Sequence, residues 1–141
     1  MPNNLPSIEV KPTLEFKSDL RALSKKYRHI KSDIQPVIER LQTGELLGDR
    51  IPGIGYEVFK ARVRNSDIKK GKSGGYRLIY YIQNRTSIIL ISIYSKSEQS
   101  DIAAEKIRRI VTEFNELSLG GDFSQDREEM QDENNGDRPS D

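Results

Sequence analysis

The chain has 141 residues, with 23 Lys and Arg against 22 Asp and Glu, and a net charge of +1. No apolar run approaches the roughly 18–20 residues that span a bilayer, and the N-terminal residues lack the apolar stretch of a signal peptide. The absence of Cys excludes disulfides, thiolate metal sites and a Cys nucleophile. These features are typical of a cytoplasmic protein.

The charge is divided between a basic body and an acidic tail. Residues 118–141 hold 8 acids, 2 bases and 3 apolar residues, so residues 1–117 carry a net charge of +7. The body has enough apolar residues for one core and is too short for two domains, whereas the tail cannot offset its ordering entropy by burial. We therefore expect one domain over 1–117 and a disordered acidic tail over 118–141, which either solubilises the protein or shields the basic body.

The first half of the body predicts a short strand and a helical hairpin. The strand is expected at Ser7–Val10. A helix follows, because apolar residues recur at helical spacing at Phe16, Leu20, Leu23 and Tyr27. After a basic turn, Ser32 and Gln35 have the spacing of a capping box for a second helix, and Gly44 suits its end. So short a link predicts an antiparallel pair of helices.

The second half changes to an alternating pattern. Gly48–Gly55 reads as a connector, and strands are predicted over Tyr56–Arg64, Tyr76–Ile82 and Ser87–Ser95. A last helix is expected to begin near Ser100 or Asp101, where an acidic first turn suits the helix dipole. The order β-α-α-β-β-β-α predicts an α+β domain, with a small antiparallel sheet, a helical hairpin on one face and a C-terminal helix.

Basic residues gather on the elements of the predicted sheet. Lys60, Arg62 and Arg64 alternate along its first strand. Further cations follow at Lys69, Lys70, Lys72, Arg77 and Lys96, with aromatic rings at Tyr76, Tyr80, Tyr81 and Tyr94. If the strands pair in order, the cations converge opposite the hairpin, on a surface that suits a phosphate backbone, and rings beside them can stack on exposed bases. Tyr80 and Tyr81 point to opposite faces, so at least one of them is expected in the core. An ordinary solvent-facing strand and loop would show the same cations, so the pattern supports a binding domain and does not by itself indicate an enzyme.

Metal and acid–base constellations built on histidine are not visible in the sequence. The single histidine, His29, lies in a basic turn and is expected to be a solvated surface residue. No His or carboxylate cluster has the spacing of metal ligands. We therefore predict no metal site and no cofactor.

Two motifs point to a known family. The segment 70–82, KGKSGGYRLIYYI, resembles the central hairpin of RelE-type toxins, in particular the HigB-like branch with its KGK-x-GG-x-R-[IVL]-IYY pattern. The segment 91–102, ISIYSKSEQSDI, is similar to the family's last strand and helix start, Y-x-K-x-E-x-x-D-[IL]. The motifs lie at the family's mutual distance, and the resemblance covers about residues 7–115.

The resemblance implies a type II toxin–antitoxin toxin that cuts mRNA in the ribosomal A site and inhibits translation. Arg77 matches the family arginine that stabilises the scissile phosphate, and Lys96 lies near the basic residue that protonates the leaving oxygen. Lys60 and Arg62 match the alternate basic pair of the preceding strand. The further residues expected to contact RNA or the ribosome are Arg64, Lys70, Lys72 and Tyr94. The implied partners are a cognate antitoxin, the ribosome and mRNA, without a cofactor or a membrane.

The proton acceptor stays open within this resemblance. Attack of a ribose 2′-hydroxyl on the adjacent phosphate needs alignment, charge stabilisation and proton transfer. Arg62 remains protonated and is a poor base, which leaves Lys60, Lys72 or a group positioned by the ribosome. Some RelE toxins have a catalytic tyrosine where this sequence has Ala103. Tyr94 either replaces it or packs at the end of its strand.

Two other functions are compatible with the sequence. ParE-like toxins share this architecture and inhibit DNA gyrase by binding. A degenerate toxin or an RNA-binding domain would also bind without cleaving. The basic cluster with Arg77 and Lys96 favours the nuclease, because a protein that only binds does not need it.

Overall fold

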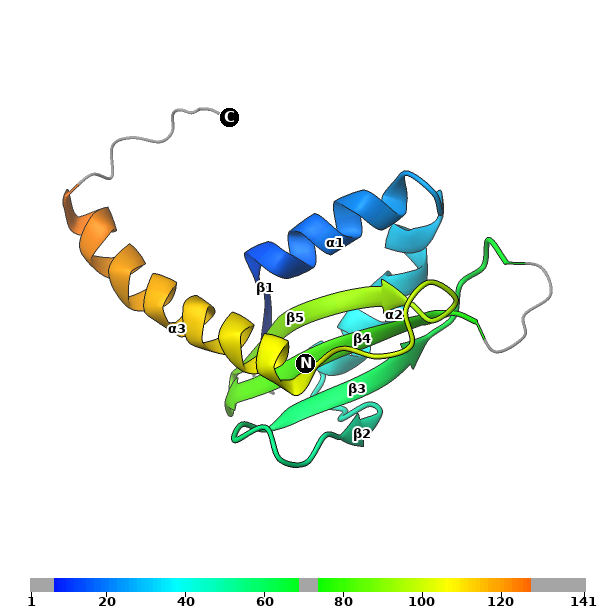
Figure 1. Ribbon diagram of the computed structural model, residues 1–141. Coiled ribbons are helices and arrows are strands. Elements are labelled where there is room, and N and C mark those ends of the chain that lie inside the picture. Colours follow the sequence, from blue (N-terminus) through cyan, green and yellow to red (C-terminus); the bar gives the residue numbers. More distant parts are fainter. Residues whose placement is uncertain (1–6, 69–73, 128–141) are drawn as a thin grey trace, which may run out of the picture. The chain divides into compact units, whose positions relative to one another are not determined.

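The computed structural model describes residues 7–68 and 74–127, the last ten of these by their backbone only (Figure 1). The chain divides into two compact units after Ile110, and the first unit holds the sheet, the helical hairpin and the start of the last helix. The elements are β1 (Glu9–Pro12), α1 (Leu14–Ser24), α2 (Ile30–Gln42), β2 (Asp49–Arg50), β3 (Val58–Val63), β4 (Tyr76–Asn84), β5 (Ser87–Ser95) and α3 (Ala104–Arg127). The predicted α+β class and element order are confirmed, with β2 added.

The sheet has five strands in the order β1-β5-β4-β3-β2. The strands β3, β4 and β5 form the predicted antiparallel meander, whereas β1 pairs parallel to β5. The prediction of a connector over Gly48–Gly55 is wrong at Asp49 and Arg50, which pair with β3. Two residues are too few to show an alternating pattern, so only the pairing partner reveals this strand.

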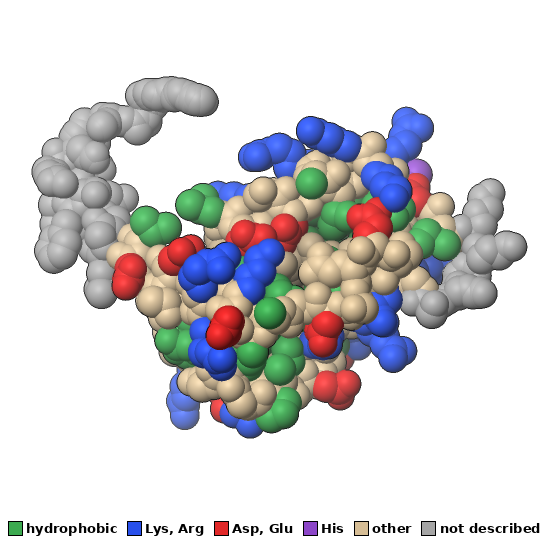
Figure 2. All heavy atoms as spheres, viewed as in Figure 1, with side chains coloured by type: hydrophobic (Ala, Val, Ile, Leu, Met, Phe, Trp, Pro, Cys, Tyr) green, Lys and Arg blue, Asp and Glu red, His purple; other side chains and the backbone are tan. Residues whose placement is uncertain are grey.

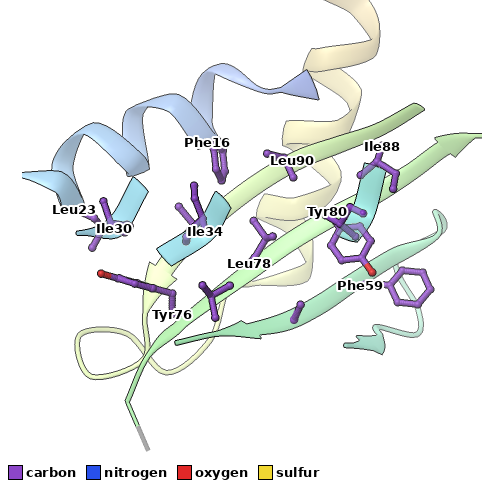
Figure 3. Close-up of a cluster of buried hydrophobic side chains, with 14 of the residues drawn as sticks. Phe16, Leu23, Ile30, Ile34, Phe59, Tyr76, Leu78, Tyr80, Ile88 and Leu90 are labelled. Carbon is purple, nitrogen blue, oxygen red and sulfur yellow. The ribbon is translucent and has the colours of Figure 1, made fainter. Parts of the chain in front are cut away.

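The helical hairpin covers one face of the sheet. Apolar residues of α1 and α2, among them Phe16, Leu23, Ile30 and Ile34, point toward alternate residues of the strands (Figure 3). The strand residues of this core include Phe59, Ala61, Val63, Tyr76, Leu78, Tyr80, Ile88, Leu90 and Ile93. Since successive side chains of a strand face opposite sides, this core places Lys60, Arg62 and Arg77 on the other face.

All four tyrosines expected near the cations are buried, and three of them contribute nothing to the groove. Tyr76 and Tyr80 are fully buried against the hairpin, where Tyr80 stacks on Phe59 with ring centroids 5.4 Å apart. Tyr81 is buried on the opposite face and meets Tyr56 edge to face. The expectation that these rings stack on exposed bases is wrong for all three, because packing leaves their faces no access to solvent.

The start of α2 depends on tertiary contacts. The predicted capping box at Ser32 and Gln35 is wrong, because the helix begins at Ile30, after an N-cap at His29 that makes no side-chain cap. Instead, the Asp67 carboxylate accepts hydrogen bonds from the His29 backbone N–H (2.9 Å) and pairs with its Nδ1 (2.7 Å). His29 is exposed as predicted, yet it ties the hairpin to the loop after β3. The predicted stop is confirmed, since α2 ends just before Gly44, which has a φ of +95°.

The last helix differs from the prediction at both ends. It begins at Ala104, after Ser100 and Asp101, and continues to Arg127, into the segment predicted as a tail. Residues 128–141 lie outside the described residues. Within the described part of the chain, no helix is long and apolar enough to cross a membrane.

Candidate functional site

A groove with a volume of about 920 Å³ lies over the face of the sheet opposite the hairpin core and reaches α2 at the β2 edge. The ionisable side chains that line it are Arg40, Asp49, Arg50, Lys60, Arg62, Arg77, Tyr94, Lys96 and Asp101. The face seen in Figure 2 likewise carries Lys and Arg side chains with acidic side chains among them. The groove is therefore basic in excess, but its cations are interspersed with carboxylates.

Strand pairing sets the arrangement of the predicted site residues. Arg62 of β3 pairs with Arg77 of β4, and Arg77 pairs with Tyr94 of β5. These three residues therefore form a row across the sheet, with Lys60 two positions before Arg62 and Lys96 two positions after Tyr94. Residues that are up to 36 positions apart in the sequence thus line one groove.

Glycine at position 75 lets β4 begin close to its neighbours. Gly75 has a φ of +81°, and a Cβ there would lie 2.7 Å from the backbone oxygen of Val63. Its own carbonyl accepts a hydrogen bond from the Lys96 backbone N–H at 2.9 Å. A side chain at this position would push these strand ends apart, so the Gly-Tyr-Arg sequence is what allows Arg77 and Lys96 to share one end of the groove.

Arg77 is half-buried and held by its own backbone surroundings. Its Nη1 donates long hydrogen bonds to the carbonyl oxygens of Gly74 (3.4 Å) and Tyr76 (3.3 Å). Among the described residues, no ion pair neutralises it. A guanidinium carries five N–H donors in a planar fork, so this residue retains donors for two oxygens of a phosphate.

The carboxylate of Asp101 is a site residue that the sequence analysis missed. Its Oδ1 lies 3.0 Å from Lys60 Nζ and accepts hydrogen bonds from Ile102 N–H (2.9 Å) and Tyr94 OH (3.5 Å). The Lys60 ammonium, followed by the Ile102 N–H, holds the pKa of this carboxyl below its usual range. The sequence predicts a helix that begins near Ser100 or Asp101, but α3 begins at Ala104, three residues after Asp101. The motif Y-x-K-x-E-x-x-D ends on this residue and was the one signal that marked it.

Tyr94 contributes a hydroxyl to the groove and keeps its ring buried. The residue is 5% exposed. Burial raises the pKa of its phenol, and the negative charge of Asp101 raises it further. It therefore offers no exposed ring face for a base, and its expected role in RNA binding is limited to the hydroxyl. Ala103, the N-cap residue of α3, is exposed and brings no hydroxyl of its own.

The other predicted contact residues lie outside the groove or outside the described part of the chain. Arg64 is exposed beyond the end of β3 and does not line the groove. Lys70 and Lys72 lie outside the described residues. Of the predicted residues, the structure therefore brings together Lys60, Arg62, Arg77, Tyr94 and Lys96.

This arrangement suits a phosphodiester. Cations from neighbouring strands line one groove, where a phosphate would be contacted from several sides, and the partial burial of Lys60, Arg77 and Lys96 strengthens their interactions relative to water. The proximity of an ammonium, a guanidinium and a hydroxyl also provides groups for charge stabilisation and proton transfer.

Comparison with known proteins identifies the family of this chain. The family model of the RelE toxin of the RelE/RelB toxin–antitoxin system matches residues 16–127. The match includes the hairpin, the three-stranded meander and α3, and so contains every groove residue named above. The family implies an antitoxin as partner. The chain belongs to the RelE toxin family and is a toxin of a toxin–antitoxin system.

Proposed function

We propose that this toxin is a ribosome-dependent mRNA endonuclease that arrests translation in the cytoplasm. The observation that supports this most directly is the row formed by Arg62, Arg77 and Tyr94, flanked by Lys60 and Lys96 in one groove. A surface that only attracts RNA needs positive charge alone. Here a half-buried guanidinium lies next to an ammonium and a hydroxyl, as a reaction at phosphorus requires.

The proposed reaction is transfer of the phosphodiester within the RNA. The ribose 2′-hydroxyl gives its proton to a base, Lys72 or a group positioned by the ribosome, and its oxygen attacks the adjacent phosphorus. The bond from phosphorus to the 5′-oxygen breaks, and a 2′,3′-cyclic phosphate and a 5′-hydroxyl result. Arg77 stabilises the negative charge that develops on the phosphoryl oxygens, and Lys96 gives a proton to the departing 5′-oxygen. Lys60 and Arg62 hold the phosphate backbone on either side of the scissile bond.

The groove offers little that would align the RNA substrate. The rings of Tyr76, Tyr80 and Tyr81 are buried, so they cannot hold the bases of a single strand. A reaction of this kind depends strongly on the 2′-oxygen lying in line with the leaving oxygen. We infer that the ribosome, which holds mRNA codon by codon, supplies this alignment.

A cleavage map tests the proposal. After brief expression of the toxin, new 5′ ends are located on a translated mRNA and on the same mRNA without its start codon, with Arg77→Ala as the matched variant. Cuts within codons that require translation and disappear in Arg77→Ala are expected. Growth arrest without cuts would contradict the proposal and favour a gyrase-binding toxin, and neither arrest nor cuts would favour a protein that only binds.

A further inference from the structure

Asp101 places a negative charge inside a groove that is otherwise suited to phosphate. Its side chain is 65% exposed and that of Lys60 is 32% exposed, so their ion pair lies open to the groove. All three donors around this carboxylate bind one oxygen, Oδ1. Among the described residues, no donor binds Oδ2. One oxygen is thus fixed by side chains from two strands and by the following backbone N–H.

Helix capping does not explain this residue. The N-cap of α3 is Ala103, whose carbonyl accepts the bonds from Lys106 and Ile107, and Asp101 lies two residues earlier. The Asp101 carboxylate accepts one backbone hydrogen bond, from the N–H of Ile102, and this residue precedes the helix. An exposed ion pair also contributes little to folding. A carboxylate here repels an incoming phosphate, so we look for another contribution of Asp101 that offsets this repulsion.

Asp101 binds two groups of the groove, Lys60 and Tyr94, and so fixes where they lie. Lys60 comes from β3 and Tyr94 from β5, and the strand between them, β4, carries Arg77. A lysine side chain has four rotatable bonds, and its ammonium is placed only when a partner holds it. Lys60 gives one N–H to Asp101 and retains two others, so it can contact a phosphate without leaving its partner.

We propose that Asp101 is a positioning residue of the groove, which holds the Lys60 ammonium and the Tyr94 hydroxyl in place on either side of Arg77. This inference rests on the proposed nuclease function. It assigns Lys60 to stabilising charge rather than to accepting the proton of the 2′-hydroxyl, because its ammonium stays bound to a carboxylate. Other ionisable groups around Lys60 are Asp49 on β2, Arg62 on β3, Arg77 on β4 and Lys96 after β5.

The test separates binding from cleavage. Ribosomes are programmed with a short mRNA that carries either ribose or 2′-deoxyribose at the A-site codon, and the variant is Asp101→Asn. On the cleavable mRNA, we expect the single-turnover rate to fall roughly 10- to 100-fold, as for a misplaced catalytic group. On the 2′-deoxy mRNA, affinity should stay unchanged or increase, because a negative charge is removed. A faster cleavage would overturn the proposal and make Asp101 a competitor of the phosphate, and a joint loss of affinity and thermal stability would make it a structural residue.

Asp49→Asn is the matched control. Asp49 lines the same groove and pairs in register with Lys60, but its carboxylate is not bonded to Lys60 or Tyr94. The substitution makes the same change of charge without touching the positioned groups. It should not reproduce the loss of rate. An equal loss in both variants would overturn the proposal, because a general effect of charge would then account for it.

A double variant tests whether Asp101 acts through Lys60. If it does, Asp101→Asn should slow cleavage by a smaller factor in a Lys60→Met background than in the wild type, since one of the two groups to be positioned is gone. Losses that multiply would overturn the proposal. NMR titration of the Asp101 carboxyl in the isolated protein tests the pairing of Asp101 with Lys60 without any cleavage assay, and so does not depend on the nuclease function. Its pKa should rise in Lys60→Met toward the ordinary range, even if the wild type cut no mRNA, and an unchanged pKa would show that the pairing itself is absent.

Discussion

The two faces of the central sheet are made from the same strands and differ most where the groove lies. The face under the helical hairpin is a closed apolar core, in which Leu78 and Tyr80 are at most 1% exposed. The opposite face carries Lys60, Arg62 and Arg77 in an open groove. Alternation along β3 and at the start of β4 separates the two sets residue by residue, whereas Ile79, Tyr81 and Ile89 on the groove face are buried as well. Neighbouring residues of one strand therefore contribute either to the core or to the groove. Substitutions on the hairpin face should lower stability, whereas substitutions of the groove cations should lower activity.

The largest expected effect is a loss of stability on the hairpin face. Leu78→Ala removes a fully buried side chain from the core, which should lower the free energy of unfolding by about 2–5 kcal/mol. Urea denaturation measures this. Arg62→Ala, at an exposed position on the opposite face, is the control and should change stability by at most about 0.5 kcal/mol. Similar losses in both variants would contradict the division between the faces.

On the groove face, the expected effect is a loss of activity with the fold retained. Arg77→Lys keeps the charge but removes the planar fork that contacts two phosphate oxygens. We expect single-turnover cleavage on programmed ribosomes to fall by about 10- to 100-fold, with an unchanged urea midpoint. Full activity of Arg77→Lys would mean that charge alone is required there.

A substitution at Gly48 tests whether the pairing of β2 with β3 at the edge of the groove requires a glycine. It has a φ of +82°, and a Cβ would lie 2.1 Å from the backbone oxygen of Lys60. Gly48→Ala should therefore push β2 away from β3 and cost about 1–3 kcal/mol of unfolding free energy. Gly53→Ala is the matched comparison, because Gly53 also has positive φ but has open space around a Cβ. An equal cost in both would assign the effect to φ alone.

A smaller and pH-dependent effect is expected from the hairpin side. Asp19 accepts hydrogen bonds from Ser92 OH (2.6 Å) and Ile93 N–H (3.2 Å), and burial raises its pKa to about 6. Because this pKa lies above the unfolded value, its contribution to stability is complete below about pH 3.8 and is lost as the pH rises through about 6. Asp19→Asn should remove about 2 kcal/mol of this pH dependence.

Urea midpoints of the wild type and Asp19→Asn, compared between pH 4 and pH 7, measure the difference. The urea midpoint of the variant should increase relative to that of the wild type as the pH rises, since the amide oxygen accepts the same hydrogen bonds without a charge. Parallel pH profiles would show that Asp19 keeps its ordinary pKa in the folded protein.

The smallest expected effect concerns salt. Arg62 is exposed in the row beside Arg77, where it contacts the phosphate backbone in the proposed function. Arg62→Ala should reduce the slope of log affinity against log salt by about 0.7, the value for one contact to a single strand. The affinity for programmed ribosomes is measured between 50 and 200 mM salt, values typical of such series. An unchanged slope would remove Arg62 from the interface.

Periodic patterns were enough to predict the class of the fold and most of its core. The stripe through Phe16, Leu23 and Tyr27 and the alternation around Leu78 each specify a buried face by spacing alone, because helices and strands have fixed periods. The pair of motifs, around Arg77 and around Lys96, predicted the family that the family model then confirmed. Short or irregular segments were beyond this reasoning, as β2 and the start of α2 show.

The site was determined partly by sequence and partly by tertiary structure. The charge pattern and the resemblance to RelE-type toxins identified Lys60, Arg62, Arg77, Tyr94 and Lys96 as candidates, together with Arg64, Lys70 and Lys72. Only the folded chain decided that Tyr76, Tyr80 and Tyr81 are buried, and that Asp101 pairs with Lys60 across 41 positions of sequence. The physical reason is that periodicity is a local property of the chain, whereas burial depth and ion pairing depend on which segments meet in space.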